Sequence, residues 1–149
     1  MRFLFDKLRE GKYDRLRVER ADGVEEIACP KVGGIPHDMV HYAVEKVMQA
    51  DGFLRRVANG EALSFRMAAN VTSDQMERLV EVMQADAISG YPSPSDMIDM
   101  YRVTCDARGV APYPVTEADI EALREEMARL SQLWAATPAG STLALEFEH

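Results

Sequence analysis

Hydrophobic and polar residues alternate through residues 13 to 29 in the pattern of a β-hairpin. Leu16 and Val18 alternate with charged residues, and the return side again keeps its apolar side chains on one face. Between the two sides lies Asp22-Gly23, a strong hairpin signal because glycine accepts the positive φ that such a turn demands. The pattern therefore predicts two antiparallel strands.

Both ends of the chain show strand patterns as well. Met1 to Lys7 predicts a strand that turns Phe3 and Phe5 inward. Thr142 to His149 alternates more cleanly, with one face made of Leu143, Leu145 and Phe147. We expect both ends to join the hairpin in one small antiparallel sheet.

Between these ends, apolar residues recur at helical spacing. The first predicted helix starts at Pro36, a residue suited to the first helical turn, and runs to about Gln49. Residues 53 to 70 mix short apolar clusters with a glycine and indicate short helices and loop. Three further helices are expected, one capped by Thr72 or Ser73, one beginning at Ser93 or Ser95, and one opened by Thr116 and Asp119.

The later helices carry clear apolar stripes. The helix after Ser73 has a stripe made of Met76, Leu79, Val80, Met83 and Ala87. The last helix has one made of Ile120, Leu123, Met127, Leu130 and Trp134. Trp134 is expected to anchor this helix on the sheet, while Glu125 and Arg129 pair on its outer side.

These elements predict an α+β fold in one domain, residues 1–149. A small antiparallel sheet, formed by the N-terminal hairpin and the C-terminal strand, packs against four to five helices. A chain of 149 residues with 47% hydrophobic residues is long enough to bury its own core without a disulfide or a structural metal.

Charge and composition narrow the classes of partner. A net charge of -8 repels phosphate backbones, and the Lys and Arg residues are interleaved with acidic ones, so nucleic acid is not expected as a partner. The N-terminus is charged too early for a signal peptide, and no run approaches the length of a membrane span, so we expect a cytoplasmic protein that does not enter membranes. Cys29 and Cys105 are expected to be free, buried thiols.

The first predicted helix holds the one segment that indicates chemistry. His37, His41 and Glu45 are four residues apart, so their side chains form a row along one side of the helix. The row borders the apolar arc of the helix, where an imidazole lies between core and solvent and its pKa is open to tuning. This row predicts His37, His41 and Glu45 as ligands of a divalent metal such as Zn²⁺, with Asp38 as a catalytic base.

The string His37-Asp38-x-x-His41 superficially resembles the His-Glu-x-x-His of zinc peptidases, in which two histidines bind Zn²⁺ and the carboxylate activates water. It departs from that motif in three ways. Asp is shorter than Glu, the pair lies in the first helical turn, and no downstream motif marks a third ligand beyond Glu45. Peptidase activity is therefore not carried over, and a catalytic site would need a further carboxylate, such as one from the middle helices.

Other roles for this region stay open. The histidines can serve structure by hydrogen bonding to loop carbonyls, with Asp38 favouring the start of the helix. Cys29 could act as a thiol nucleophile if it met His37 or His41. Gly33-Gly34 could form a phosphate-binding loop, although a simple turn explains the two glycines better.

The segment Gly34-x-Pro36-His37-Asp38-Met39-Val40-His41, placed after an Asp-Gly hairpin, resembles a segment of uncharacterised bacterial proteins of this size. The resemblance covers about the first third of the chain. It implies a shared fold and carries no activity with it.

Two hypotheses about function follow. The first is a small interaction or binding domain without catalysis, which acts through self-association or a protein partner, because no complete catalytic set can be named. The second is a metal-binding or metal-dependent hydrolase-like protein centred on His37 and His41.

Overall fold

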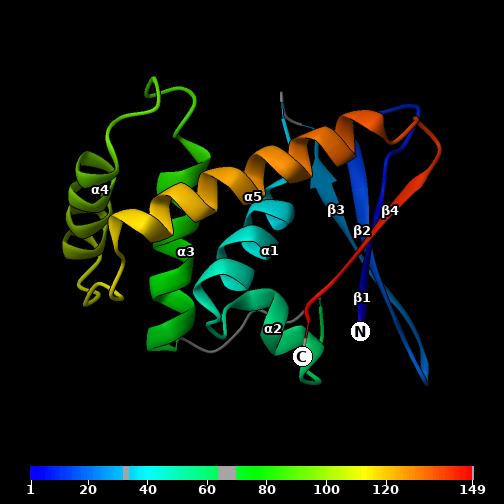
Figure 1. The fold of residues 1–149 in the computed structure, drawn as a ribbon. Helices are drawn as coiled ribbons and strands as arrows, with labels where there is room; N and C mark the ends of the chain where they lie inside the picture. The colour runs from blue at the N-terminus through cyan, green and yellow to red at the C-terminus, as the bar shows by residue number, and fades with distance from the viewer. Residues whose placement is uncertain (32–33, 64–69, 149) are drawn as a thin grey trace.

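The computed structural model describes residues 1–31, 34–63 and 70–148, and these residues form an α+β fold. The strands are β1 (Arg2–Asp6), β2 (Tyr13–Arg20), β3 (Gly23–Pro30) and β4 (Thr142–Glu146). The helices are α1 (His37–Met48), α2 (Phe53–Ala58), α3 (Val71–Gln84), α4 (Pro94–Ala107) and α5 (Glu117–Ala136). Figure 1 shows the helices on one side of the sheet, with α5 crossing α1 and α3.

The sheet confirms the strands expected from both ends of the chain and from the hairpin. Its order is β3-β2-β1-β4, and every neighbouring pair is antiparallel. Phe3 pairs with Val18 on one side and with Leu145 on the other, so the alternating apolar positions of three strands fall on the same face. That face is buried against the helices and forms part of the core.

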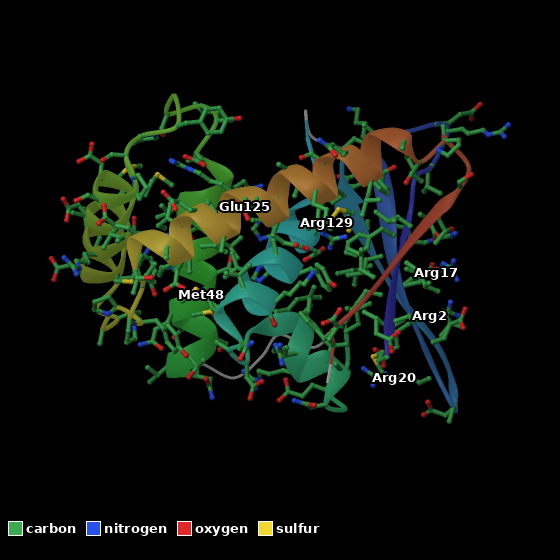
Figure 2. All side chains as sticks on the ribbon, in the orientation of Figure 1. Arg2, Arg17, Arg20, Met48, Glu125 and Arg129 are labelled. Atoms are coloured by element: carbon green, nitrogen blue, oxygen red, sulfur yellow. The ribbon has the colours of Figure 1, made fainter. Side chains whose placement is uncertain are left out.

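The opposite face of the sheet holds a buried carboxylate. Asp6 is 4% exposed and accepts hydrogen bonds from Arg15 at 2.7 Å, from Arg17 at 2.5 and 2.9 Å, and from Thr142 at 2.6 Å. Burial by itself raises the pKa of the Asp6 carboxyl, but the bonds from Arg17, Thr142 and Arg15 hold it well below its usual range. Figure 2 shows Arg17 on this face, which points away from the helices. Asp6 therefore ties β1 to β2 and β4.

Helix α1 lies in the middle of the helical layer. It packs against α2, α3, α5 and β3, and the run from Met39 to Glu45 is buried on every side. Tyr42 stacks on Phe147 with ring centroids 4.9 Å apart, and its hydroxyl donates to the Glu146 carbonyl at 2.8 Å. The expectation that the histidine row borders solvent is therefore wrong for His41, because neighbouring helices enclose α1.

The helix starts are mostly as predicted. Ser93 caps α4, and Thr116 with Asp119 forms a full capping box on α5. Helix α3 is capped by Asn70, whose Oδ1 accepts from the Ser73 N–H at 3.2 Å, in place of a cap at Thr72 or Ser73. Asn70 lies immediately before the first residue of α3, where an Asn side chain reaches the free N–H groups best.

The C-terminal part of α5 is held by Lys7, the residue that follows β1. The Lys7 ammonium donates to the Trp134 carbonyl at 2.7 Å and lies 5.0 Å from the centroid of the Trp134 ring. The expected partner of Arg129 was wrong, since Arg129 Nε bonds Glu126 Oε2 at 3.1 Å and not Glu125. Both Glu125 and Arg129 are labelled on α5 in Figure 2.

One residue of the predicted α3 stripe is wrong, and two predicted segments are not described by the structure. Helix α3 ends at Gln84, so Ala87, which the stripe placed in the core, is exposed. Gly33 of the predicted turn and residues 64–69 of the predicted loop lie outside the described residues. Within the described ranges, none of the helices has the length and apolar character that crossing a bilayer requires.

Candidate metal centre

The two histidines of α1 are held one turn apart at the start of the helix. Pro36 precedes the first helical residue, and its carbonyl accepts from the N–H groups of Met39 and Val40 at 2.9 and 3.2 Å. Residues four apart lie on the same side of a helix, so the His37 and His41 rings meet edge to face, with centroids 4.9 Å apart. Both rings turn toward α3.

Helix α3 supplies a carboxylate to this pair. Glu77 Oε2 lies 2.7 Å from His41 Nε2, and Glu77 Oε1 lies 3.6 Å from His37 Nε2. One ligand atom from each of the three residues can be chosen so that all lie within 4.8 Å of one another. His37, His41 and Glu77 therefore form a two-histidine, one-carboxylate group.

The group lies at the boundary between core and solvent, although its members differ in exposure. The His41 side chain is 5% exposed, while those of His37 and Glu77 are 40% and 34% exposed. His41 is also covered by Phe53 of α2, with ring centroids 5.9 Å apart. A small ion could reach the group from solvent past His37 and Glu77, with His41 as its inner ligand.

Gln84 contacts the His37 ring nitrogen that does not face Glu77. Its Oε1 lies 2.9 Å from His37 Nδ1. An amide oxygen only accepts hydrogen bonds, so Nδ1 carries the hydrogen and, in the neutral ring, Nε2 presents its lone pair toward Glu77. Histidines that bind metals commonly donate their other ring N–H to such an acceptor, which fixes the tautomer and the ring orientation.

Glu45, the third ligand expected from the sequence, lies on the other side of His41. Its Oε2 is 3.5 Å from His41 Nδ1, whereas Glu77 faces Nε2. Glu45 is fully buried, and its two oxygens accept from the N–H groups of Leu54 at 3.1 Å and Arg55 at 2.8 Å. These donors belong to the first turn of α2, where N–H groups have no partner within the helix.

A close approach of backbone to side chain makes this placement of Glu45 possible. A Cβ atom on Gly52, the residue before α2, would lie 2.7 Å from Glu45 Cδ. Glycine is therefore needed at position 52 for α2 to start directly on the Glu45 carboxylate. Within the described part of the chain, the buried His41 Nδ1 has no hydrogen-bond partner, and Glu45 is the carboxylate beside it.

The carboxylates set the charge of the histidines. Burial by itself disfavours the His41 imidazolium, but Glu45 and Glu77 on its two sides outweigh burial and raise its pKa to about 10. Glu77 also raises the pKa of His37. Burial raises the pKa of the Glu77 carboxyl, yet the bonds with His37 and His41 leave it well below its usual range. Without a metal, the His41 ring is therefore an imidazolium that lies between the carboxylates of Glu45 and Glu77.

Asp38, expected as a catalytic base, is placed elsewhere. Its Oδ2 accepts a hydrogen bond from Cys29 Sγ on β3 at 3.2 Å, and it is not one of the three grouped residues. Burial and the neighbouring Asp38 raise the pKa of the Cys29 thiol well above its usual range. The thiol is therefore neutral and bonded to a carboxylate, which argues against the nucleophile that Cys29 and a histidine could have formed.

Glu77 is the site residue that sequence reasoning did not name. A catalytic site would need a further carboxylate, such as one from the middle helices, and Glu77 of α3 is a carboxylate of that kind beside the histidines. One signal could have found it, because Glu77, Glu81 and Gln84 form a polar row beside the apolar stripe of α3. The polar row of α3 faces the histidines of α1 only if the two helices pack together, and the sequence pattern does not predict which helices pack together.

No family model matches the chain, and searches of curated proteins and of solved structures found no match either.

Proposed function

We propose that this protein binds one divalent transition-metal ion, Zn²⁺ by preference, through His37 Nε2, His41 Nε2 and a Glu77 carboxylate oxygen. The observation that carries the proposal is the convergence of two imidazoles from α1 and one carboxylate from α3 within 4.8 Å. Imidazole nitrogen and carboxylate oxygen are usual zinc ligands, and two histidines with one glutamate is a ligand set of catalytic zinc sites.

The two separations between Glu77 and the histidines are close to those of a zinc site. In a tetrahedral zinc site with bonds of about 2.0–2.1 Å, neighbouring ligand atoms are about 3.3 Å apart. His37 Nε2 lies 3.6 Å from Glu77 Oε1, and His41 Nε2 lies 2.7 Å from Glu77 Oε2. The Glu77 carboxylate must therefore move away from His41 by about 0.6 Å and turn one oxygen toward both rings. Glu77 is one-third exposed, and its side chain can make that movement.

The outer contacts of the two rings also support the proposal. Gln84 Oε1 bonds His37 Nδ1 at 2.9 Å, and Glu45 Oε2 lies 3.5 Å from His41 Nδ1, near enough to become its acceptor after a small movement. Such acceptors orient imidazole ligands and increase their basicity. In this proposal Glu45 is a positioning residue for His41, and Glu77 takes the ligand role that the sequence suggested for Glu45.

Three protein ligands leave a coordination position for water or substrate, as catalytic zinc sites do and structural zinc sites do not. The exposed side of the group, at His37 and Glu77, is where a substrate would approach. The class of reaction that this supports is metal-dependent hydrolysis. A role for Asp38 as base stays a prediction, and the proposal does not depend on it.

The test is metal binding by purified protein from which an affinity tag has been removed. The protein is stripped with chelator, titrated separately with Zn²⁺, Fe²⁺ and Mn²⁺, dialysed, and analysed for bound metal. The informative variant is Glu77→Gln, which keeps the size of the side chain at a partly exposed position. Glu81→Gln is the matched control, because Glu81 is on the same helix with a side chain that is 36% exposed.

We expect one zinc ion per chain in the wild type and in Glu81→Gln, and loss of it in Glu77→Gln. Equal zinc content in Glu77→Gln and the wild type would contradict the proposal, as would a wild-type protein that takes up no metal. In that case His37, His41, Glu45 and Glu77 serve only as polar contacts that join α1 to α2 and α3.

The other hypothesis, an interaction domain that self-associates or binds a protein partner, stays a prediction. The exposed large apolar residues include Tyr13 on β2, Val71 on α3 and Val103 on α4, which belong to different elements. Sedimentation velocity over a range of concentrations would test self-association directly.

A further inference from the structure

A pocket of about 780 Å³ is lined in part by Gln84, whose Oε1 bonds His37. Its walls come from the start of α1, the end of α3, the connection between α3 and α4, and the middle of α5 (Figure 1). The apolar part of the lining includes Ile35, Val40, Met83, Ile88 and Met127. Small-molecule sites in proteins are commonly concave, apolar and of about 300–1,000 Å³.

The charged groups that line this pocket, among the residues that the structure describes, are Asp86 and Arg124, and they neutralise each other. Arg124 Nε and Nη2 each bond one Asp86 oxygen at 2.8 Å, and Nη2 also donates to the Pro92 carbonyl at 2.5 Å. Asp86 is 4% exposed, so the pair is held in place. A charged ligand would face one member of a closed ion pair and gain little from it.

The rim of the pocket carries large apolar side chains in contact with solvent. Ile88 is 92% exposed and Tyr91 is 64% exposed, and both lie on the connection between α3 and α4. Tyr91 has φ 53°, a left-handed conformation that is unfavourable for any residue other than glycine. The Arg124 guanidinium lies 5.9 Å from the centroid of the Tyr91 ring. The connection therefore holds two apolar side chains at the mouth, where they would cover a bound molecule.

Two polar side chains that line the pocket indicate which polar atom a ligand would carry. Gln84 uses its amide oxygen for His37, so the amide NH₂ at the end of the same side chain can donate to a ligand. Ser131 adds a hydroxyl on the α5 side. Both groups suit a ligand with a carbonyl or hydroxyl oxygen.

We propose that this pocket binds an uncharged, mainly apolar small molecule, such as an aromatic compound or a short acyl chain with one carbonyl or hydroxyl group. The ligand lies between α3 and α5, with Ile88 and Tyr91 over it and its oxygen at Gln84 or Ser131. Met83 and Met127 let the walls adapt to the shape of the ligand. The pocket does not include His37, His41 or Glu77, so this proposal does not depend on metal binding.

The probe for the test is N-phenyl-1-naphthylamine, an uncharged dye that fluoresces when it enters an apolar site. The full chain is titrated in the presence of EDTA, so that the result does not depend on metal. Ala128→Phe fills the pocket from an exposed position on α5. The matched control is Ala135→Phe, the same change at an exposed position of α5 that does not line the pocket.

We expect saturable binding of one dye per chain to the wild type and to Ala135→Phe, and at least tenfold weaker binding to Ala128→Phe. The anionic analogue 8-anilinonaphthalene-1-sulfonate is expected to bind less tightly than the uncharged dye. Unsaturable binding, or equal affinity of Ala128→Phe and the wild type, would overturn the assignment of the pocket. Tighter binding of the sulfonate would overturn the assignment of an uncharged ligand. Circular dichroism of each variant confirms that it is folded.

Discussion

Replacement of Gly52 by alanine is expected to destabilise the fold through a single steric contact. The new Cβ would lie 2.7 Å from Glu45 Cδ, 2.9 Å from Cγ and 3.0 Å from Oε2. Glu45 is 0% exposed, so it has no open space into which it can withdraw. The backbone at Gly52 has φ -90°, which alanine adopts without strain, so the contact alone causes the effect.

The size of the effect follows from the bonds that Glu45 makes. To relieve the contact, either the carboxylate or the start of α2 must move, which weakens the bonds from the Leu54 and Arg55 N–H groups. A hydrogen bond to a charged group contributes about 1.5–3 kcal/mol. Alanine regains about 0.4–1 kcal/mol because it restricts the unfolded chain. If about half of the two bonds is lost, the cost is about 1.5–3 kcal/mol. After the gain from alanine is subtracted, Gly52→Ala lowers the free energy of unfolding by about 0.5–2.6 kcal/mol.

Urea unfolding followed by circular dichroism measures this difference. Gly34→Ala is the control, because a Cβ at Gly34 meets no atom within 4 Å. We expect the free energy of unfolding of Gly34→Ala to be unchanged or slightly higher. The reasoning is refuted if Gly52→Ala is as stable as the wild type. Such a result would mean that Glu45 does not support α2 in solution.

Three further predictions follow from single side chains. Glu45→Gln should weaken zinc binding by about 10–100-fold at pH 7, because the carboxylate beside His41 is lost. Competition with a chromophoric chelator measures this affinity, and an unchanged affinity would remove Glu45 from the proposed site. Asp6→Asn should lower the free energy of unfolding by about 1–3 kcal/mol at pH 7. Since the folded-state pKa of Asp6 is below its ordinary 3.8, this stability is present above about pH 4 and is lost as the pH falls further. The difference in free energy of unfolding between wild type and variant, measured with urea, should therefore narrow toward pH 2. A difference that does not change with pH would contradict the role of the Asp6 charge. Thr116→Ala should cost about 1 kcal/mol in the same assay through loss of the α5 cap, whereas no loss would show that the capping box contributes little.

The strands and helices could be predicted because their signals are local. Alternation of apolar residues in 13–29 and 142–149 reports which side chains share a face of a strand, and Thr116 with Asp119 marks a helix start within four residues. The miss at Asn70 has the same origin, since Asn, Thr and Ser at neighbouring positions are all good caps and the sequence alone does not choose among them.

The sequence predicted the two candidate ligands on α1 but not Glu77 on α3. The four-residue spacing of His37 and His41 placed both rings on one side of α1, and the structure brings them within 4.9 Å, centroid to centroid. The same spacing suggested Glu45 as the next ligand. Glu45 instead binds the start of α2 and faces the other nitrogen of His41, while Glu77 faces Nε2.

What the sequence by itself determined is therefore the set of elements, their caps and the pair of histidines on one helical face. The tertiary structure decided that α1 is enclosed, so that His41 is buried, and that α3 brings Glu77 to the histidines. It also decided that α3 and α5 leave a pocket between them. The physical reason is that spacing along the chain fixes geometry within a helix or strand, whereas the contacts between elements depend on how all of them share one core.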